Sequence, residues 1–289
     1  MKNRILFGYL AGIGAASIWG AMYVVSKVVM KVIPPFSLIT LRLLLGIFVL
    51  LIIVLWRGGF SLTGNQFWRV FGVGLIGYGV SIGFQFVGTN LSTAANGALV
   101  TSATPAFVLL FAALLLGEKI TLRRLAALTI ATFGVIAVID PRQAQLSSLF
   151  LGNISLIAAA LTWALYSVLV RQVTRDVDVL QTSLIAFAGG LPISIPFGVW
   201  EASNIGYGPI TWAVIGGILF LGIISTALAM YLWNSAFAAL DANAASLTFF
   251  AQPIVGTILG AVILKETITP LFVLGGIMIG IGLYITRRP

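Results

Sequence analysis

Long apolar runs follow one another along almost the whole of this chain. Cutting the sequence at charges, prolines and glycine clusters leaves residues 5–30, 36–56, 68–90, 93–116, 122–139, 150–171, 179–199, 211–237, 242–264 and 270–286. A helix needs about 20 mostly apolar residues to cross a bilayer. Only helices or closed barrels satisfy their backbone in lipid, and these runs lack the alternation of barrel strands. The sequence therefore predicts an all-α polytopic membrane protein with ten transmembrane helices.

The composition agrees with a membrane protein and excludes several functions. Hydrophobic residues make up 60% of the chain and charged residues 8%, whereas a soluble domain carries about 25% charged residues. The net charge of +9 comes from basic residues that stand singly at the ends of apolar runs. Such residues orient a protein in the membrane, so we expect no nucleic-acid partner. Cys and His are absent, and we expect no cofactor, no metal site and no enzyme activity.

The two halves of the chain repeat one another. The stretch PAFVLLFAALLLGEKIT at 105–121 returns as PIVGTILGAVILKETIT at 253–269, with the prolines, glutamates and Ile-Thr pairs in register. Earlier in the chain, Trp19 and Trp163 are the equivalent residues of AASIW and AALTW. An ordered series of matches across both halves indicates duplication. We expect two five-helix repeats, residues 5–139 and 148–286.

The basic residues predict how the chain is oriented. If the N-terminus is cytoplasmic, 11 of the 16 Lys and Arg residues fall in cytoplasmic segments and 4 outside, with Arg42 inside a span. The positive-inside rule then puts both termini in the cytoplasm. Because five spans is an odd number, the second repeat would enter the membrane from the opposite side. Inverted repeats are typical of secondary transporters, whose substrates bind near the midplane between the halves.

Three motifs give the chain a family resemblance. They are AASIWG at 15–20, the arginine of LITLRLLLG at 38–46, and the two helices that run from proline to glutamate. With them, the chain resembles the drug/metabolite transporter superfamily of the EamA type, and most of all the YddG-type amino-acid exporters. The resemblance implies a monomeric carrier in the bacterial inner membrane that exports amino acids or related small metabolites. It also implies a central cavity lined by spans 1, 3, 4, 6, 8 and 9.

Polar and aromatic residues mark the candidate substrate site. In the third span Tyr78, Ser81 and Gln85 share one helical face, and polar groups at membrane depth avoid lipid. The candidate substrate-binding residues are Trp19, Tyr78, Ser81, Gln85, Asn96, Thr101, Trp163, Tyr166, Trp233, Asn234 and Gln252. The alternative is that these groups bond helices to one another. Four further tryptophans at span ends are typical of an interfacial belt: Trp56, Trp68, Trp200 and Trp212.

The charged residues leave several interpretations open. Arg42 could neutralise a helix end, extend to the interface or touch substrate, and the equivalent residue in the second half is Ala186. That departure favours a structural role. Glu118 and Glu266 are expected to cap helices. A carrier of cationic drugs would be expected to hold an acid in mid-membrane, and none appears. Such a carrier and a passive channel are the alternatives to an amino-acid exporter.

Overall fold

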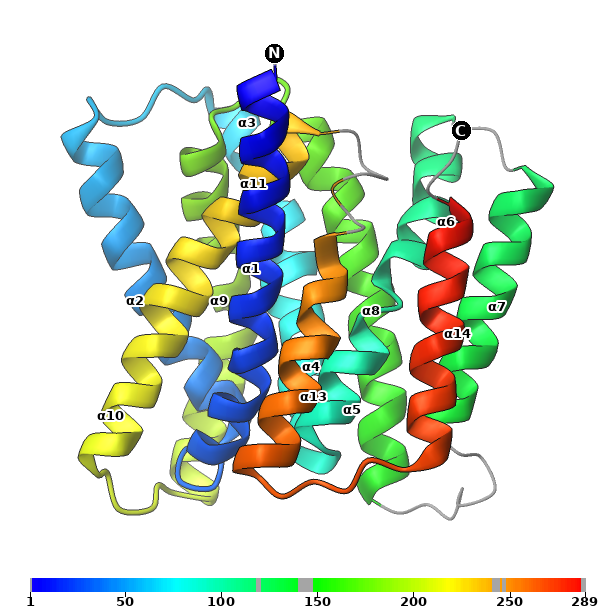
Figure 1. The fold of residues 1–289 in the computed structure, drawn as a ribbon. Coiled ribbons are helices and arrows are strands. Elements are labelled where there is room, and N and C mark those ends of the chain that lie inside the picture. Colours follow the sequence, from blue (N-terminus) through cyan, green and yellow to red (C-terminus); the bar gives the residue numbers. More distant parts are fainter. Residues whose placement is uncertain (1, 118–120, 140–147, 241–244, 246–247, 287–289) are drawn as a thin grey trace.

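The structure is a computed structural model that describes residues 2–117, 121–139, 148–240, 245 and 248–286 (Figure 1). Its elements within these residues are helical. They are α1 (Lys2–Val29), α2 (Pro35–Trp56), α3 (Gly64–Gly74), η1 (Leu75–Ser81), α4 (Ile82–Leu91), α5 (Ala94–Thr101), α6 (Thr104–Leu116), α7 (Leu122–Ile139), α8 (Ser148–Val173), α9 (Val179–Asn204), α10 (Trp212–Leu219), η3 (Phe220–Leu228), α11 (Ala229–Ala239), η4 (Thr248–Phe250), α13 (Ala251–Ile263) and α14 (Pro270–Thr286). η1 and η3 are π-helical and η4 is a short 3₁₀ turn.

Seven helical stretches of the described residues are long and apolar enough to cross a bilayer. They are Ile5–Val29, Pro35–Trp56, Gly64–Leu91, Ala94–Leu116, Ser148–Val173, Val179–Asn204 and Trp212–Ala239. Two shorter apolar helices cover Thr248–Ile263 and Pro270–Gly282. The protein is therefore an all-α polytopic membrane protein, and the count of ten spans stays a prediction.

The third helical stretch begins at Gly64, earlier than the residue 68 at which the sequence pattern put it. The Thr63 side chain accepts the backbone N–H of Gln66, and the Gln66 side chain accepts the backbone N–H of Thr63. This capping box satisfies two donors that a helix start leaves free. The first turn of α3 is polar, so the pattern of apolar runs placed the start of this span too late.

Helices from the two halves of the chain pack against one another through the middle of the bundle. The adjacent pairs include α2 with α9, α4 with α8, α1 with α11, and α1 with α13. Figure 1 shows that α1 and α8 run in opposite directions, and that the start of α1 and the end of α14 lie at the same end of the bundle. The central residues are thus supplied by both halves.

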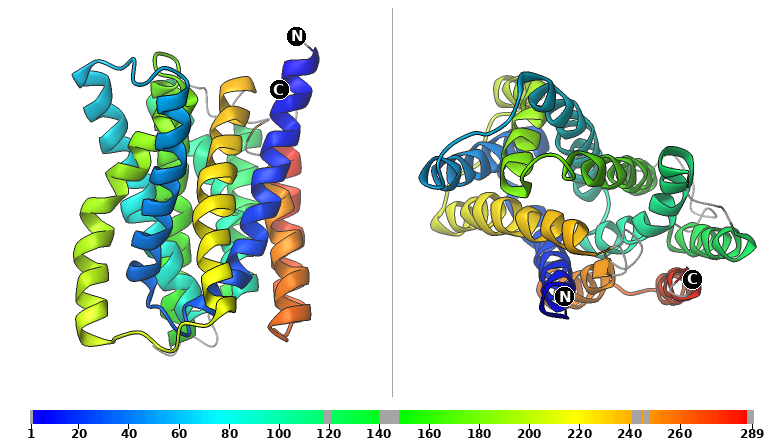
Figure 2. Two further views of the ribbon diagram at one scale, coloured as in Figure 1. Left: turned by 90° about the vertical axis from the view of Figure 1, so that its left-hand side faces the viewer. Right: turned by 90° about the horizontal axis from the view of Figure 1, so that it is seen from above.

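Helices α7 and α14 form a pair at one side of the bundle (Figure 2). Their backbones meet at two glycines: a Cβ atom added to Gly275 would lie 2.5 Å from the carbonyl oxygen of Gly134. Small residues allow this close approach, as is common between membrane helices. The pair lies away from the central residues described below.

The helical stretch expected over residues 93–116 is interrupted near Pro105. α5 ends at Thr101 and α6 begins at Thr104, with Pro105 in its first turn. Proline has no N–H for the preceding turn, so Pro105 suits the first turn of α6, where that N–H would have no partner in the helix. The π-helical segments η1 and η3 occupy similar positions in the two halves, and such segments are frequent at functional sites.

The turn between α4 and α5 is held by two charged side chains. Glu266 accepts the backbone N–H groups of Ala94 at 2.7 Å and Ala95 at 2.8 Å. Lys27 Nζ donates to the carbonyl oxygens of Thr89 at 2.8 Å, of Asn90 at 2.7 Å, and of Ser92. The negative charge of Glu266 lies at the N-terminus of α5, and the positive charge of Lys27 lies at the C-terminus of α4. Both placements are favourable with respect to the helix dipoles. The predicted capping role of Glu266 is confirmed, whereas Glu118 lies outside the described residues.

Candidate functional site

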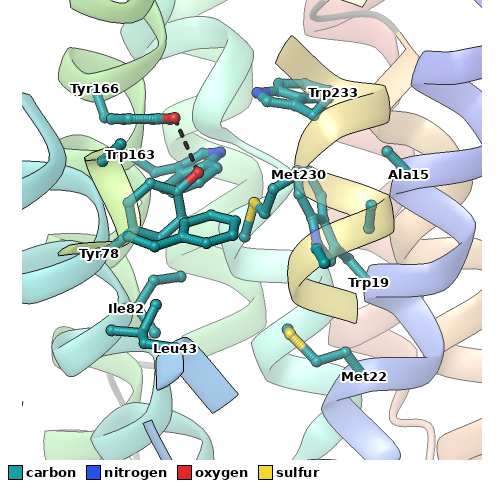
Figure 3. Packing of buried hydrophobic residues seen from close by; sticks show 14 of the residues in the cluster. Ala15, Trp19, Met22, Leu43, Tyr78, Ile82, Trp163, Tyr166, Met230 and Trp233 are labelled. Atoms are coloured by element: carbon teal, nitrogen blue, oxygen red, sulfur yellow. Dashed lines mark hydrogen bonds between the residues drawn. The ribbon is translucent and has the colours of Figure 1, made fainter. Parts of the chain in front are cut away.

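The three deep tryptophans form one aromatic cluster at the centre of the bundle (Figure 3). The Trp19 ring centroid lies 5.8 Å from Trp163, 5.2 Å from Trp233 and 5.7 Å from Phe249. These spacings are typical of favourable aromatic pairs. Trp19 comes from α1, Trp163 from α8 and Trp233 from α11, so the cluster joins both halves of the chain.

Exposure separates these tryptophans from the four at the helix ends. Trp19, Trp163 and Trp233 expose 3%, 7% and 1% of their surface. The exposed fractions of the others are 87% for Trp56, 66% for Trp68, 58% for Trp200 and 87% for Trp212. The burial agrees with the division made from the sequence, in which only the first three lie deep enough to reach a central cavity.

A buried hydrogen-bond chain runs behind the aromatic cluster. The hydroxyl groups of Tyr78 and Tyr166 lie 2.9 Å apart, and Tyr166 donates to Asn234 Oδ1 at 3.4 Å. Asn234 Nδ2 then donates to Ser183 Oγ at 2.7 Å. The four residues come from η1, α8, α11 and α9, so the chain fixes these elements against one another. Its polar groups are satisfied by the protein itself, as buried polar groups usually are.

A second network lies on the other side of the cluster. The Tyr23 hydroxyl is 2.7 Å from Thr101 Oγ1, and Gln252 Nε2 donates to the same Thr101 oxygen at 2.8 Å. Gln85 Nε2 donates to the Tyr23 hydroxyl. The network therefore joins α1, α4, α5 and α13. Both amide residues, Gln85 and Gln252, also line the central cavity.

A small cavity lies beside the second network and the aromatic cluster. It is lined by Trp19, Met22, Ser81, Ile82, Gln85, Thr101, Thr104, Ala159, Trp163, Met230, Phe249 and Gln252. Its volume is ≈ 20 Å³, which is room for one or two water molecules. Ligand pockets for larger molecules run to about 300–1,000 Å³. The centre of the bundle is therefore too tightly filled for an amino acid in this structure, and its lining must move before a substrate can bind.

Two polar atoms of cavity residues have no hydrogen-bond partner within the described part of the chain. They are Gln85 Oε1, which is an acceptor, and Trp163 Nε1, which is a donor. A buried polar group without a partner costs about 1–3 kcal/mol, so native proteins rarely keep one without a reason. Both residues line the cavity. The site can thus offer one acceptor and one donor to a polar ligand.

The structure divides the residues predicted from the sequence into three groups. Six of them line the cavity: Trp19, Ser81, Gln85, Thr101, Trp163 and Gln252. Another four, Tyr78, Tyr166, Trp233 and Asn234, pack behind its wall. Asn96 lies elsewhere, where its Nδ2 donates to Asn153 Oδ1 at 3.2 Å and to Ser92 Oγ at 3.2 Å.

Several lining residues were missed because they are apolar. Met22, Ile82, Ala159, Met230 and Phe249 line the cavity but carry no polar signal that separates them from ordinary packing residues. For two of these residues, Met22 and Ile82, helical periodicity could have indicated a place in the cavity lining. Met22 follows Trp19 by three residues, and Ile82 precedes Gln85 by three, so each shares a helix face with a predicted residue. Figure 3 shows the two methionine side chains beside Trp19.

The fold and the cavity together are typical of membrane transporters for small molecules, whose binding sites lie between helices of two halves. The class defined here is therefore a polytopic membrane transporter rather than an enzyme. More specifically, the chain belongs to the EamA-like transporter family, whose pattern matches residues 6–139 and again 150–288. Membership shows the drug/metabolite transporter type that the sequence motifs suggested, and it implies a small-molecule substrate.

Curated relatives agree with this assignment over nearly the full chain. A protein of Escherichia coli (strain K12) named "Probable amino-acid metabolite efflux pump" is 28% identical over 284 residues, which cover 93% of this chain and 90% of the relative. An "Uncharacterized transporter" of Archaeoglobus fulgidus is 27% identical, covering 93% and 95%. One solved crystal structure matches with a TM-score of 0.67 at 21% identity, covering 97% and 96%. This last likeness concerns the fold alone.

Proposed function

We propose that this transporter exports amino acids or related small metabolites across the bacterial inner membrane. Two five-helix repeats, residues 5–139 and 148–286, would alternate access to one central site, with both termini in the cytoplasm. The opposite directions of α1 and α8 support an inverted arrangement (Figure 1). The relative named as an amino-acid metabolite efflux pump supports the substrate class.

The observation that carries this proposal is the pair of free polar atoms in an aromatic cavity. A zwitterion needs a donor for its carboxylate and an acceptor for its ammonium group. Trp163 Nε1 and Gln85 Oε1 supply one of each. The faces of Trp19 and Trp163 add an apolar wall, and aromatic faces also attract ammonium groups. The site thus suits a small polar solute with an apolar side chain.

Alternating access requires the closed centre to open. With a cavity of ≈ 20 Å³, entry of an amino acid must displace Met22 and Met230, whose side chains are flexible enough to adapt to a ligand. The π-helical segment η1 carries the lining residue Ser81, and η3 ends two residues before the lining residue Met230. A change from π to α geometry in these segments would rotate the lining side chains. If the site opens to the two faces in turn, the solute is exported down its own concentration gradient.

A carrier of cationic drugs is the second candidate. Such a site is expected to hold a carboxylate that neutralises the cation, and the cavity lining contains no acid. A passive channel is the third, and the saturation of flux separates it from a carrier.

Counterflow in proteoliposomes tests the proposal. Vesicles holding purified protein are loaded with one unlabelled solute from a panel of amino acids, nucleosides, sugars and quaternary amines, and entry of the labelled solute is followed. We expect saturable counterflow with amino acids. Counterflow with quaternary amines alone would support the cationic alternative, and linear, non-saturating flux would support a channel.

A further inference from the structure

Arg42 is a charged residue in the interior of the bundle whose described partners carry no negative charge. Only 1% of its surface is exposed. Nε donates to Thr226 Oγ1 at 2.8 Å, and one terminal nitrogen donates to Ser225 Oγ at 3.4 Å. The other terminal nitrogen meets the sulfur of Met22 at 3.4 Å. The guanidinium also lies 4.9 Å from the Phe86 ring centroid.

These contacts do not neutralise the positive charge of the Arg42 guanidinium. A guanidinium has five N–H donors, and its partners here are two hydroxyls, a thioether and a ring face. Sulfur is a weak acceptor, and the bond to Ser225 is long. Within the described residues no acid lies within ion-pair distance of Arg42. A buried, unpaired charge is costly in a membrane protein, and such residues are usually functional.

The position of Arg42 also excludes the two simple structural roles expected from the sequence. It cannot extend to the interface, because it is fully buried between α1, α2, α4 and η3. Nor does it neutralise the end of a helix, because Ser225 and Thr226 lie within the π-helical segment η3 and are contacted through their side chains.

Only one half of the chain makes room for such a group. α2 packs on η3, and the equivalent helix α9 packs on η1. At the position equivalent to Arg42, Ala186 lies directly on the facing backbone: a Cβ on Gly74 would meet the Ala186 carbonyl oxygen at 2.2 Å. If this position served the same packing role in both halves, both halves would hold a residue of similar size there. Instead the first half holds Arg42, and the second holds Ala186 in contact with a neighbouring backbone. A ligand with a single anionic group needs only one such residue.

Arg42 is separated from the central cavity by one side chain. Met22, which contacts the guanidinium, lines the cavity together with Trp19. Ser225 also links Arg42 to the wall of the cavity. Its backbone oxygen accepts a hydrogen bond from the Trp19 indole N–H at 3.1 Å, and its hydroxyl accepts one from Arg42. Rotation of the Met22 side chain would let an anion in the enlarged cavity reach the guanidinium. Arginine binds carboxylates with paired, charge-assisted hydrogen bonds.

We propose that Arg42 is the specificity residue that binds the carboxylate of the transported solute once Met22 moves aside. This rests on the proposed function, and it narrows the substrate to solutes that carry a carboxylate. The carboxylate becomes the missing counter-ion, so the charge of Arg42 is neutralised only in the loaded carrier. Amines without a carboxylate are then poor substrates.

The test compares acids with their amides. Counterflow is measured for L-alanine, L-threonine, L-phenylalanine and L-tryptophan, and for the four corresponding carboxamides. The native protein is expected to exchange at least one acid about tenfold or more faster than its amide, because a site built for a polar group rejects an analogue that lacks it. Arg42→Gln should abolish this preference by slowing the acid alone, and Arg42→Lys should retain part of it.

The matched control is Arg57→Gln, the same substitution at the exposed end of the same helix. It should leave the ratio of acid to amide unchanged. If Arg42→Gln does not fold, Met22→Ala serves instead. Shortening this side chain should lower the KM for the acid more than the KM for its amide, because both enter the enlarged cavity but only the acid gains the contact with the guanidinium. An equal fall in both KM values would overturn the inference.

Equal exchange of acid and amide by the native protein would overturn the inference, as would an equal loss of both in Arg42→Gln. Failure of the proposed substrate class looks different. If pyruvate or succinate exchanges in place of every amino acid, and Arg42→Gln abolishes that exchange, then the carboxylate site stands while the amino-acid assignment fails.

Discussion

The hydroxyl oxygens of Tyr78 and Tyr166 lie 2.9 Å apart and connect the two parts of the chain that match the EamA pattern. Tyr78 belongs to η1 and Tyr166 to α8, and both side chains are fully buried. Tyr166 also donates to Asn234 Oδ1 at 3.4 Å, so its hydroxyl is shared by Tyr78 of η1 and Asn234 of α11. Figure 3 shows the bond between the two tyrosines.

The shared hydroxyl predicts unequal losses of stability. Tyr166→Phe removes both of its hydrogen bonds, and Tyr78→Phe removes one, so we expect about 2 and about 1 kcal/mol of destabilisation respectively. The double variant should lose less than the sum, because the bond between the tyrosines is counted twice. Thermal unfolding of the detergent-solubilised protein measures this. Strict additivity would show that the two hydroxyls do not interact.

The free polar atoms predict effects on transport without loss of fold. Gln85→Ala and Trp163→Phe each remove one of these atoms, and each should raise the KM of counterflow by about tenfold, equivalent to 1.4 kcal/mol. Trp163→Phe should cost about 1–3 kcal/mol through lost packing of a buried ring on Trp19 and Tyr166, with nothing added by the N–H, which has no partner within the described residues.

The control for these variants is Asn96→Ala. It also removes a membrane amide, but one bonded to Asn153 away from the cavity. Its KM should match that of the native protein. An equal rise in KM for all three variants would mean that the cavity is not the binding site.

The contact between α7 and α14 predicts a sharp difference between neighbouring glycines. Gly275→Ala puts a Cβ 2.5 Å from a backbone oxygen, whereas Gly276→Ala puts one 3.7 Å from a flexible Leu99 side chain. The first should cost about 1–3 kcal/mol through overpacking. The second should stay within about 0.5 kcal/mol of the native protein. Unfolding midpoints of the purified variants measure both, and equal midpoints would contradict the close approach.

The orientation of the chain can be read by labelling single cysteines, since the native chain has none. Arg57 and Lys265 are exposed, and they follow helices that end at opposite faces of the bundle (Figure 1). We expect Arg57→Cys to react only with a reagent on the cytoplasmic side and Lys265→Cys only from outside. Labelling of both from one side would refute the proposed topology. Lys119, the equivalent of Lys265 near the first repeat's glutamate, lies outside the described residues.

The sequence by itself determined the class of fold and the depth of its residues. Runs of apolar residues must become membrane helices, because lipid offers no other partner for the backbone. Position along a run gives depth, so the buried Trp19 could be told from the exposed Trp56. Charge beside a helix end also predicted that Glu266 caps a helix, but the helix that it caps, α5, begins 172 residues away in the sequence and was decided by the tertiary structure.

Only the tertiary structure decided which deep residues meet. Gln85 and Asn96 are both amides at membrane depth, yet one reaches the central cavity and the other bonds to Asn153. Arg42 likewise turned out to be buried against η3 without an acid partner among the described residues. Helical periodicity fixes which residues share a face of one helix, but it does not fix how that face is rotated toward its neighbours. The rotation comes from packing between helices that are far apart in the sequence, and it alone separates a site residue from a structural one.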